Sequence, residues 1–426
     1  MEYKKRITDE AFDQKLRVFG GVLIIGPKGC GKTTSAKKKA KSIVEFQDED
    51  KRDFYLTTAE TVPSRLLIGE NPRLFDEWQD APKIWGAARK SIDDSQKKGL
   101  YIFTGSSSSS VETSHTGTLR ISTLRMDPMS LYESGESGGE VSLKELFAGK
   151  ELTPLSSSFA FDDLLQAACR GGWPASLDPS LGKDDSLLVA KDLFYQTCHV
   201  DISKIDGVKR NPVTAERILK SYSRNIATLA KSKTIYDDVN NESSISETTF
   251  NDYLGALRKL YIIEDVEAWT PAIRSRELMR NTPKRNLVDP SIAVASLGLS
   301  PSYFNEDLKT FGFLFESLCL RDLRIYSSSL DGKLSYYHDR YGLEADAVLH
   351  LGDGRYALIE FKLGEGQIEE GARHLNEIEA LIKKANEREG RIRLRMPDLK
   401  VVITGGSIAF KREDGVYVVP ITCLKD

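Results

Sequence analysis

The chain has 426 residues, of which 60 are basic and 63 acidic, and 40% are hydrophobic. This length predicts about two to four domains of ordinary globular composition. A net charge of -3 argues against a global polyelectrolyte role, and no apolar run approaches the roughly 20 residues that span a bilayer. The five scattered cysteines show no zinc-ligand spacing, and the charged N-terminus lacks the apolar core of a signal peptide. We therefore expect a cytoplasmic protein with reduced thiols and no membrane contact.

The first motif is a glycine-rich loop between a strand and a helix. Residues 22–25 (VLII) form an unbroken apolar run, which is typical of a strand buried on both faces. GPKGCGKT follows at 26–33, and the helix-forming stretch TSAKKKAKSIVEF occupies 34–46. This order matches GxxxxGK[ST] in its strand–loop–helix context and predicts a site for the phosphates of ATP. A chance glycine-rich turn before a helix is the alternative.

The residues of this loop divide the binding of phosphate and metal. Backbone N–H groups close around the phosphates, and the dipole of the following helix favours their negative charge. The Lys32 side chain would reach the β- and γ-phosphates, and the Thr33 hydroxyl would bind Mg²⁺. The predicted cofactors are therefore ATP and Mg²⁺. The predicted loop residues are Gly26, Pro27, Lys28, Gly29, Cys30, Gly31, Lys32, Thr33 and Thr34.

Such a loop needs an acidic partner that holds the metal and polarises water. The short run RLF ends in Asp76 and Glu77. We expect Asp76 to hold Mg²⁺ through water and Glu77 to orient the attacking water. An acidic turn that opens a helix over 81–97 is the alternative, because carboxylates are favourable at a helix N-terminus. The predicted strand 100–103 is followed by Thr104, whose polar side chain would sense the γ-phosphate.

The segment after that strand returns towards the sheet with three basic side chains. Residues 106–110 are a run of serines, which predicts a flexible tip. His115, Arg120 and Arg125 follow. One of these arginines, Arg120 in our prediction, would act as a finger on the nucleotide of a neighbouring copy, which makes a homo-oligomer a candidate state. An ordinary surface arginine is the alternative.

At this point the chain resembles a known family. The motifs that carry the resemblance are GPKGCGKTT, FDEWQDAPKIW, FTGSS, HTG, PMSLYESGES, CRGGWP, SISETTFNDYLGALRKLYIIED, PKRNLVDPSIA, TFGFLFESL and IEFKLG. In this order they are similar to the AAA-type bacterial and archaeal ATPases that carry a C-terminal domain of unknown function. The resemblance implies an ATP-binding AAA module, a winged-helix segment and a restriction-endonuclease-like domain. It implies no biological role, and Leu119 stands before Arg120 where relatives have glycine.

The middle of the chain is predominantly helical in its pattern. The Gly-Gly turn before Trp173 predicts a packing corner. Residues 209–233 hold seven basic side chains against one acidic, which fits a solvated helix face as well as a nucleic-acid contact. Core spacing over 250–260 behind a Ser246 cap, followed by a strand at 261–263, suggests a winged helix. A structural or lid role and a DNA contact are the two alternatives, because 246–285 is only weakly basic.

The C-terminal third contains a hairpin with charges inside its strands. In LEADAVLHLGDGRYALIEFKLGEG, residues 343–366, two apolar runs flank a Gly-Asp-Gly turn centred on Asp353. Asp346 and Glu360 are equally distant from that centre. In register they face each other on one side of the sheet, and Lys362 points the same way.

The resemblance places Glu316, Asp346, Glu360 and Lys362 on the positions of the PD-(D/E)XK nuclease pattern. Two facing carboxylates can share a divalent ion, with the Ile359 carbonyl or the helix glutamate Glu316 as a further oxygen ligand. Such an ion would activate water while Lys362 neutralises developing charge. The alternative is a buried ion cluster that remained after activity was lost.

These patterns predict an α/β chain with four parts. They are a P-loop AAA-type parallel-sheet domain (1–145), a helical connector (146–205), a helical lid or winged-helix-like domain (206–285) and a restriction-endonuclease-like α/β domain (286–426). The predicted function is a Mg²⁺-dependent ATPase whose nucleotide state controls the nuclease-like module on DNA or RNA. The alternative is an ATP-controlled binding or signalling switch with an inactive nuclease-like docking domain.

Overall fold

A computed structural model describes residues 3–105, 119–241, 244–271, 282–339, 342–387 and 393–426. The serine run at 106–110 and His115 therefore lie outside the described residues. The chain forms two compact units. The first consists of Met1–Pro128, His199–Arg210 and Asp252–Ile262, and the second of Met129–Cys198, Asn211–Asn251 and Ile263–Asp426. Among the described helices, none is long and apolar enough to cross a membrane.

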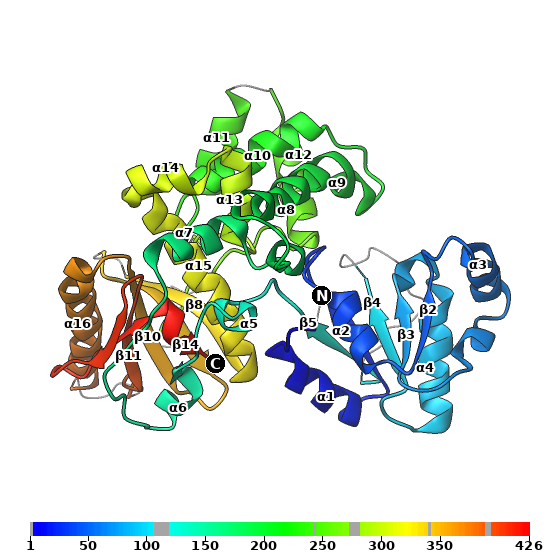
Figure 1. The fold of residues 1–426 in the computed structure, drawn as a ribbon, viewed down its shortest axis with the longest axis horizontal. Helices are drawn as coiled ribbons and strands as arrows, with labels where there is room; N and C mark the ends of the chain where they lie inside the picture. The colour runs from blue at the N-terminus through cyan, green and yellow to red at the C-terminus, as the bar shows by residue number, and fades with distance from the viewer. Residues whose placement is uncertain (1–2, 106–118, 242–243, 272–281, 340–341, 388–392) are drawn as a thin grey trace. The chain divides into compact units, whose positions relative to one another are not determined.

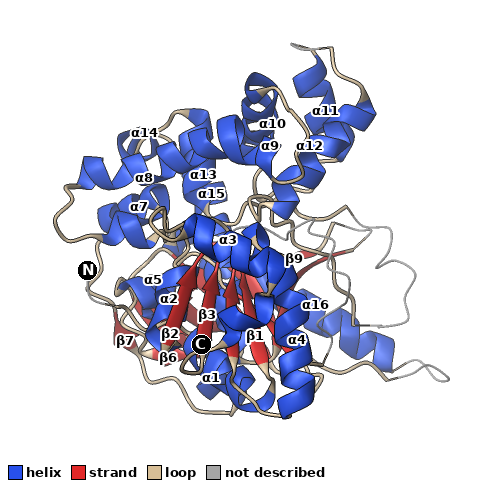
Figure 2. Cartoon of the chain, turned by 90° about the vertical axis from the view of Figure 1, so that its right-hand side faces the viewer, coloured by secondary structure: helices blue, strands red, loops and turns tan. Residues whose placement is uncertain are grey.

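The first unit is built on a parallel sheet with the strand order β2-β3-β4-β1-β5. Its strands are β1 (Gly21–Ile25), β2 (Ser42–Glu45), β3 (Arg73–Asp76), β4 (Tyr101–Thr104) and β5 (Ile121–Arg125). Its flanking helices, seen around the red strands in Figure 2, are α1 (Thr8–Val18), α2 (Lys32–Lys39), α3 (Arg52–Thr61) and α4 (Lys83–Ser95). Every residue of β4 is buried, as expected of a parallel strand covered on both faces.

The predicted strands of this unit are confirmed, and one predicted helix is wrong. The apolar run 22–25, the RLF run and the run 100–103 are all strands of the sheet. The helix expected over 34–46 is wrong, because α2 ends at Lys39 and β2 begins at Ser42. β-branched residues favour a strand, and Val44 on β2 is fully buried beside β3.

Helices dominate the middle of the chain, as predicted. They are α7 (Phe161–Arg170), α8 (Lys183–Gln196), α9 (Ile202–Lys204), α10 (Pro212–Arg224), α11 (Ser232–Asn240), α12 (Glu247–Lys259), α13 (Pro290–Leu297) and α14 (Pro301–Glu306). Ser246 caps α12 by accepting a hydrogen bond from the Thr249 amide at 3.1 Å. The strand expected at 261–263 is wrong, because Tyr261 has a positive φ of 58° and Ile263 forms only an isolated bridge with Leu287.

The second unit carries a mixed sheet with the order β7-β12-β13-β11-β10-β9-β8. Its strands are β7 (Leu155–Ser156), β8 (Gly332–His338), β9 (Glu344–Leu351), β10 (Tyr356–Lys362), β11 (Leu399–Thr404), β12 (Ile408–Lys411) and β13 (Tyr417–Pro420). The helices α15 (Leu308–Ser329) and α16 (Ile368–Asn386) pack on this sheet from opposite sides (Figure 1). A short pair, β6 (Val141–Ser142) with β14 (Leu424–Lys425), adjoins α5 (Leu131–Ser134) and α6 (Leu143–Phe147).

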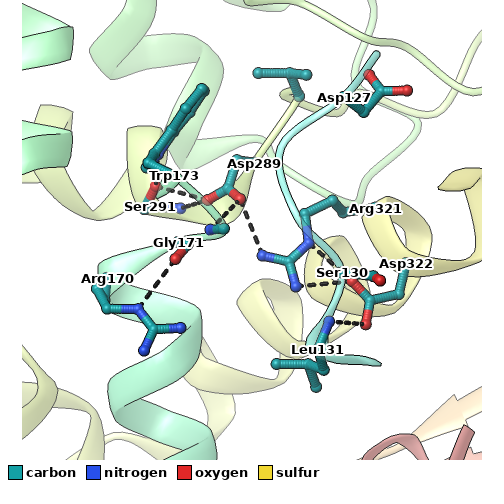
Figure 3. A network of polar contacts seen from close by, with 12 residues as sticks. Asp127, Ser130, Leu131, Arg170, Gly171, Trp173, Asp289, Ser291, Arg321 and Asp322 are labelled. Atoms are coloured by element: carbon teal, nitrogen blue, oxygen red, sulfur yellow. Dashed lines mark hydrogen bonds and ion pairs between the residues drawn. The ribbon is translucent and has the colours of Figure 1, made fainter. Parts of the chain in front are cut away.

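A buried polar network fixes the loops of the second unit to α15 (Figure 3). Arg321 lies between Asp289 at 3.0 Å and Asp322 at 2.7 Å, and all three side chains are at most 1% exposed. Asp289 also accepts hydrogen bonds from the amides of Gly172 and Ser291. A Cβ on Gly172 would lie 2.0 Å from the Met129 carbonyl oxygen, so only glycine fits there. This is the packing corner expected from the Gly-Gly turn.

Candidate functional site

The glycine-rich loop joins the end of β1 to the start of α2 in the first unit. Gly26 has a φ of 145°, and a Cβ there would lie 1.9 Å from the Met126 carbonyl oxygen. Gly29 and Gly31 also have positive φ angles, of 81° and 102°. No side chain caps the N-terminus of α2. Backbone amides at the start of this helix can therefore bind a ligand, which is the arrangement that binds phosphate.

The side chains of the loop are held in different ways. Lys32 is 6% exposed, and its ammonium donates to the carbonyl oxygens of Gly26 at 2.9 Å and Pro27 at 2.7 Å. Lys28 is exposed and pairs with Asp201 at 3.2 Å. Burial raises the pKa of the Cys30 thiol, which donates to the Met126 carbonyl and so turns into the core. Thr34 is exposed on the first turn of α2.

Three predicted residues meet beside this loop: Thr33 on α2, and Asp76 and Thr104 at the ends of the neighbouring strands β3 and β4. The Thr33 hydroxyl donates to Asp76 Oδ1 at 2.8 Å, and the Thr104 hydroxyl donates to the same carboxylate oxygen. Asp76 and Thr104 are in register across β3 and β4. Hydroxyl and carboxylate oxygens are ligands that Mg²⁺ accepts. The donor set therefore fits Mg²⁺ held by Thr33 directly and by Asp76 directly or through water.

Glu77 follows β3 in a left-handed conformation with a φ of 54°. Its carboxylate accepts a hydrogen bond from the Gln79 side-chain amide. Burial raises the pKa of this carboxyl group, and the Gln79 hydrogen bond opposes the effect. A carboxylate with a raised pKa is a better proton acceptor, which suits a group that orients and activates water.

Arg6, which lies just before α1, supports the glycine-rich loop and was not singled out from the sequence. Arg6 is 4% exposed, and its guanidinium donates to the Cys30 carbonyl at 2.8 Å and to the Asp127 carbonyl at 2.7 Å. It therefore ties the phosphate-binding loop to the segment that follows β5. No local pattern marks it, because Arg6 lies 24 residues before Cys30 in a short polar stretch.

Arg120 lies far from the loop within its own unit. Its carbonyl accepts a hydrogen bond from the Gly21 amide, so it stands at the start of β5, whereas the loop leaves the other end of β1. Its guanidinium pairs with Asp93 at 2.8 Å. Arg125 is at the loop end of β5, where it pairs with Asp127. A finger role for Arg120 thus stays a prediction, and it concerns only the nucleotide of another molecule.

The C-terminal hairpin has the register that its turn predicts. Ile359 pairs with Ala347 and Leu358 with Val348, which sets Asp346 opposite Glu360. The Phe361 amide donates to Asp346 Oδ2 at 2.9 Å. The Lys362 ammonium lies 3.2 Å from Glu360 Oε2, so the cluster of charges forms as expected.

Glu316 joins this cluster through a residue that the sequence analysis did not single out. The Lys284 ammonium lies 2.5 Å from Glu316 Oε1, 3.2 Å from the Asp346 carbonyl oxygen and 3.4 Å from Asp346 Oδ1. Glu316 therefore faces a lysine. Across the described part of the chain, no group of three or more His, Cys, Asp or Glu side chains is arranged to hold a metal. A metal bound by Glu316, Asp346 and Glu360 together does not fit this arrangement.

Burial dominates the electrostatics of the hairpin cluster. Asp346 is 9% and Glu360 1% exposed. Burial, with the charge of Asp346, raises the pKa of Glu360 to about 9. Burial also raises the pKa of Glu316 to about 8, against the opposing charge of Lys284. Glu360 Oε1 is buried without a hydrogen-bond partner, although its other oxygen faces Lys362 and, at 3.5 Å, His374.

Comparisons with known proteins divide the chain into three segments. Residues 19–135 match the family described as AAA domain. Residues 161–303 and 311–424 match two families that are each described as a domain of unknown function (DUF8612 and DUF4143). No curated protein matches the chain.

Solved structures give more distant likenesses. The Walker-type ATPase PABY2304 of Pyrococcus abyssi is 12% identical, with a TM-score of 0.41 over 68% of this chain and 94% of that chain. The ORC2 protein of Aeropyrum pernix, in ADPNP-ADP complexes, is 12% identical, with a TM-score of 0.31 over 71% of this chain and 92% of that chain. The family match and the loop geometry agree in the first unit. Residues 19–135 are therefore similar to AAA domains, and the geometry of the glycine-rich loop in this part fits the binding of ATP phosphates.

Proposed function

We propose that the first unit hydrolyses ATP with Mg²⁺. The observation that carries this proposal is the convergence of the Thr33 and Thr104 hydroxyls on one carboxylate oxygen of Asp76 beside the phosphate-binding loop. A structural loop would have no need of a buried lysine that folds over its own carbonyls, as Lys32 does. The AAA family match over 19–135 supports the same activity.

The residues would divide the reaction as follows. When ATP binds, the Lys32 ammonium would leave the carbonyl oxygens of Gly26 and Pro27 and contact the β- and γ-phosphate oxygens. Its positive charge would then stabilise ADP as the leaving group. Mg²⁺, held by Thr33 and Asp76, would neutralise phosphate charge when bound. Glu77 orients the attacking water and accepts its proton, helped by the raised pKa of its carboxyl group. Thr104 would sense the γ-phosphate, and its hydrogen bond to Asp76 supports this role.

Two substitutions test this assignment separately. Lys32→Ala should abolish tight ATP binding in a direct titration, because the phosphates lose their principal cation. Glu77→Gln should bind ATP with unchanged affinity and hydrolyse it at least about 100-fold more slowly. Lys90→Ala, an exposed lysine on α4, is the matched control and should change neither quantity. Wild-type ATP affinity in Lys32→Ala would refute the loop assignment.

We further propose that the nucleotide state controls the C-terminal module. Two forms of this proposal stand: a nuclease-like enzyme acting on DNA or RNA, and an inactive nuclease-like docking domain. The Lys284 ammonium between Glu316 and Asp346 favours the docking form, because it occupies the position where a metal would be shared.

A nicking assay separates the two forms. Supercoiled plasmid and single-stranded RNA would be incubated with the protein and Mg²⁺ or Mn²⁺, with and without ATP. Cleavage that disappears in Asp346→Asn supports the enzyme. Absence of cleavage together with ATP-dependent binding of nucleic acid, measured by anisotropy, supports the docking module. Asp353→Asn on the exposed hairpin turn is the control for charge loss near the same strands.

A further inference from the structure

The Lys284 ammonium sits in an oxygen cage supplied by two elements. Its three neighbours are Glu316 Oε1 from α15, and the carbonyl oxygen and Oδ1 of Asp346 from β9. An ammonium group has three protons to donate, so three oxygens complete its bonding. Carboxylate and carbonyl oxygens are also the ligands that divalent cations take. The cage is therefore a cation site that the chain fills with its own side chain.

The rest of the lysine is fixed as firmly as its ammonium. Lys284 exchanges both backbone hydrogen bonds with Val266 at 2.9 Å, and the residue is only 4% exposed. The ammonium also lies 5.8 Å from the centroid of the buried Tyr336 ring. The charged end is thus held by an anchored backbone and a packed stem. This restraint distinguishes Lys284 from a surface lysine that happens to meet a carboxylate.

The third carboxylate of the cluster, Glu360, does not contact the Lys284 ammonium. Glu360 is 1% exposed, and its Oε1 has no hydrogen-bond partner while Oε2 faces Lys362. A buried carboxylate oxygen without a donor is costly, and it can accept a cation. The cluster therefore offers an entering cation only Glu360 and the remaining lone pairs of Asp346.

We propose that Lys284 is a built-in cation that replaces a divalent metal between Glu316 and Asp346 and keeps the metal affinity of this cluster low. Lys284 thus limits the binding of metal ions at the hairpin cluster. Glu316 serves as its counter-ion and becomes a metal ligand only when Lys284 is removed. The inference concerns the second unit and stands whether or not the first unit hydrolyses ATP.

Titration of the full-length, nucleotide-free protein with MnCl₂ in a calorimeter tests this directly. Lys284→Met should bind Mn²⁺ at least about tenfold more tightly than wild type, because a buried like charge has gone. The gain should vanish in the double variants Lys284→Met/Glu316→Gln and Lys284→Met/Asp346→Asn. Lys333→Met, an exposed lysine on β8, should bind like wild type. Unchanged affinity in a folded Lys284→Met protein would overturn the proposal.

The single variant Glu316→Gln gives a second test that leaves Lys284 in place. With Lys284 caged, Glu316 is no ligand, so Glu316→Gln should leave Mn²⁺ binding of the wild type unchanged. If Lys284 merely swings aside for a metal, Glu316→Gln should weaken binding as much as Asp346→Asn does, and the proposal fails. Lys284→Gln replaces Lys284→Met if the latter does not fold. ATP titration of every variant separates these outcomes from failure of the P-loop assignment.

Discussion

Removing Arg321 should destabilise the second unit strongly, because this side chain is the only cation drawn in the network of Figure 3 that touches both buried aspartates. Arg321→Met keeps most of the volume and removes the charge. Asp289 and Asp322 are then buried with no compensating cation, and a buried ion pair broken on one side costs about 3–5 kcal/mol.

The hydrogen bonds that survive place the expected loss near the lower end of that range. Asp289 would retain the amides of Gly172 and Ser291 at 3.0 and 2.9 Å. Asp322 would retain the Leu131 amide at 3.0 Å. Each neutral donor offsets part of the charge penalty, so we expect about 3 kcal/mol. For a unit of this size the melting temperature should fall by roughly 5 °C.

Differential scanning fluorimetry of the full chain measures this fall. The matched control is Arg373→Met on α16, where an exposed arginine lies 3.9 Å from Glu377. An exposed pair contributes at most about 1 kcal/mol, so this variant should melt close to wild type. Acid should narrow the difference between Arg321→Met and wild type, because protonation relieves the uncompensated carboxylates. Equal melting temperatures for the two variants would refute the reasoning.

Three further outcomes are expected. Arg6→Met should weaken ATP binding by about 1–3 kcal/mol in a direct titration, because the charged hydrogen bonds that tie the loop at Cys30 to Asp127 are lost, whereas Arg17→Met on the exposed side of α1 should not. Gly172→Ala should lower the melting temperature, since its Cβ would meet a backbone oxygen at 2.0 Å; an unchanged melt would contradict that clash. Because the pKa of Glu360 is raised from 4.5 to about 9, the folded chain binds the extra proton, and stability should fall as pH rises through this window. Glu360→Gln should flatten that slope in melts at pH 6 and pH 9, and an equal slope would argue against the raised pKa.

The sequence predicts the nucleotide loop and the hairpin well because both are encoded locally. The spacing of GxxxxGK[ST] sets Gly26 and Lys32 on one loop by covalent geometry. The turn centred on Asp353 sets Asp346 opposite Glu360, because an antiparallel register follows from the turn. Neither inference needs any knowledge of the rest of the chain.

Other features depend on contacts that no local pattern encodes. The stretch 34–46 after the glycine-rich loop has good helix formers, yet Val44 lies on β2, because pairing with β3 buries its side chain in the sheet. Arg6 supports a loop 24 residues away, and its own neighbourhood is an ordinary polar stretch. The loop after α12 suggested a strand, but a left-handed Tyr261 interrupts it and only isolated bridges form.

The hairpin cluster shows why the residues of a pattern do not by themselves decide an activity. The sequence pattern predicts a nuclease-like site at Asp346, Glu360 and Lys362, and a motif search stops there. The group that changes their chemistry is Lys284, which lies 62 residues before Asp346 and 32 before Glu316. Its backbone is held beside the cluster by the isolated bridge with Val266, a contact of the folded state. Under our proposal, Glu316, Asp346 and Glu360 would bind a metal only without Lys284 and form an internal ion cluster with it. The metal titration of Lys284→Met therefore bears on function more directly than any substitution within the motif.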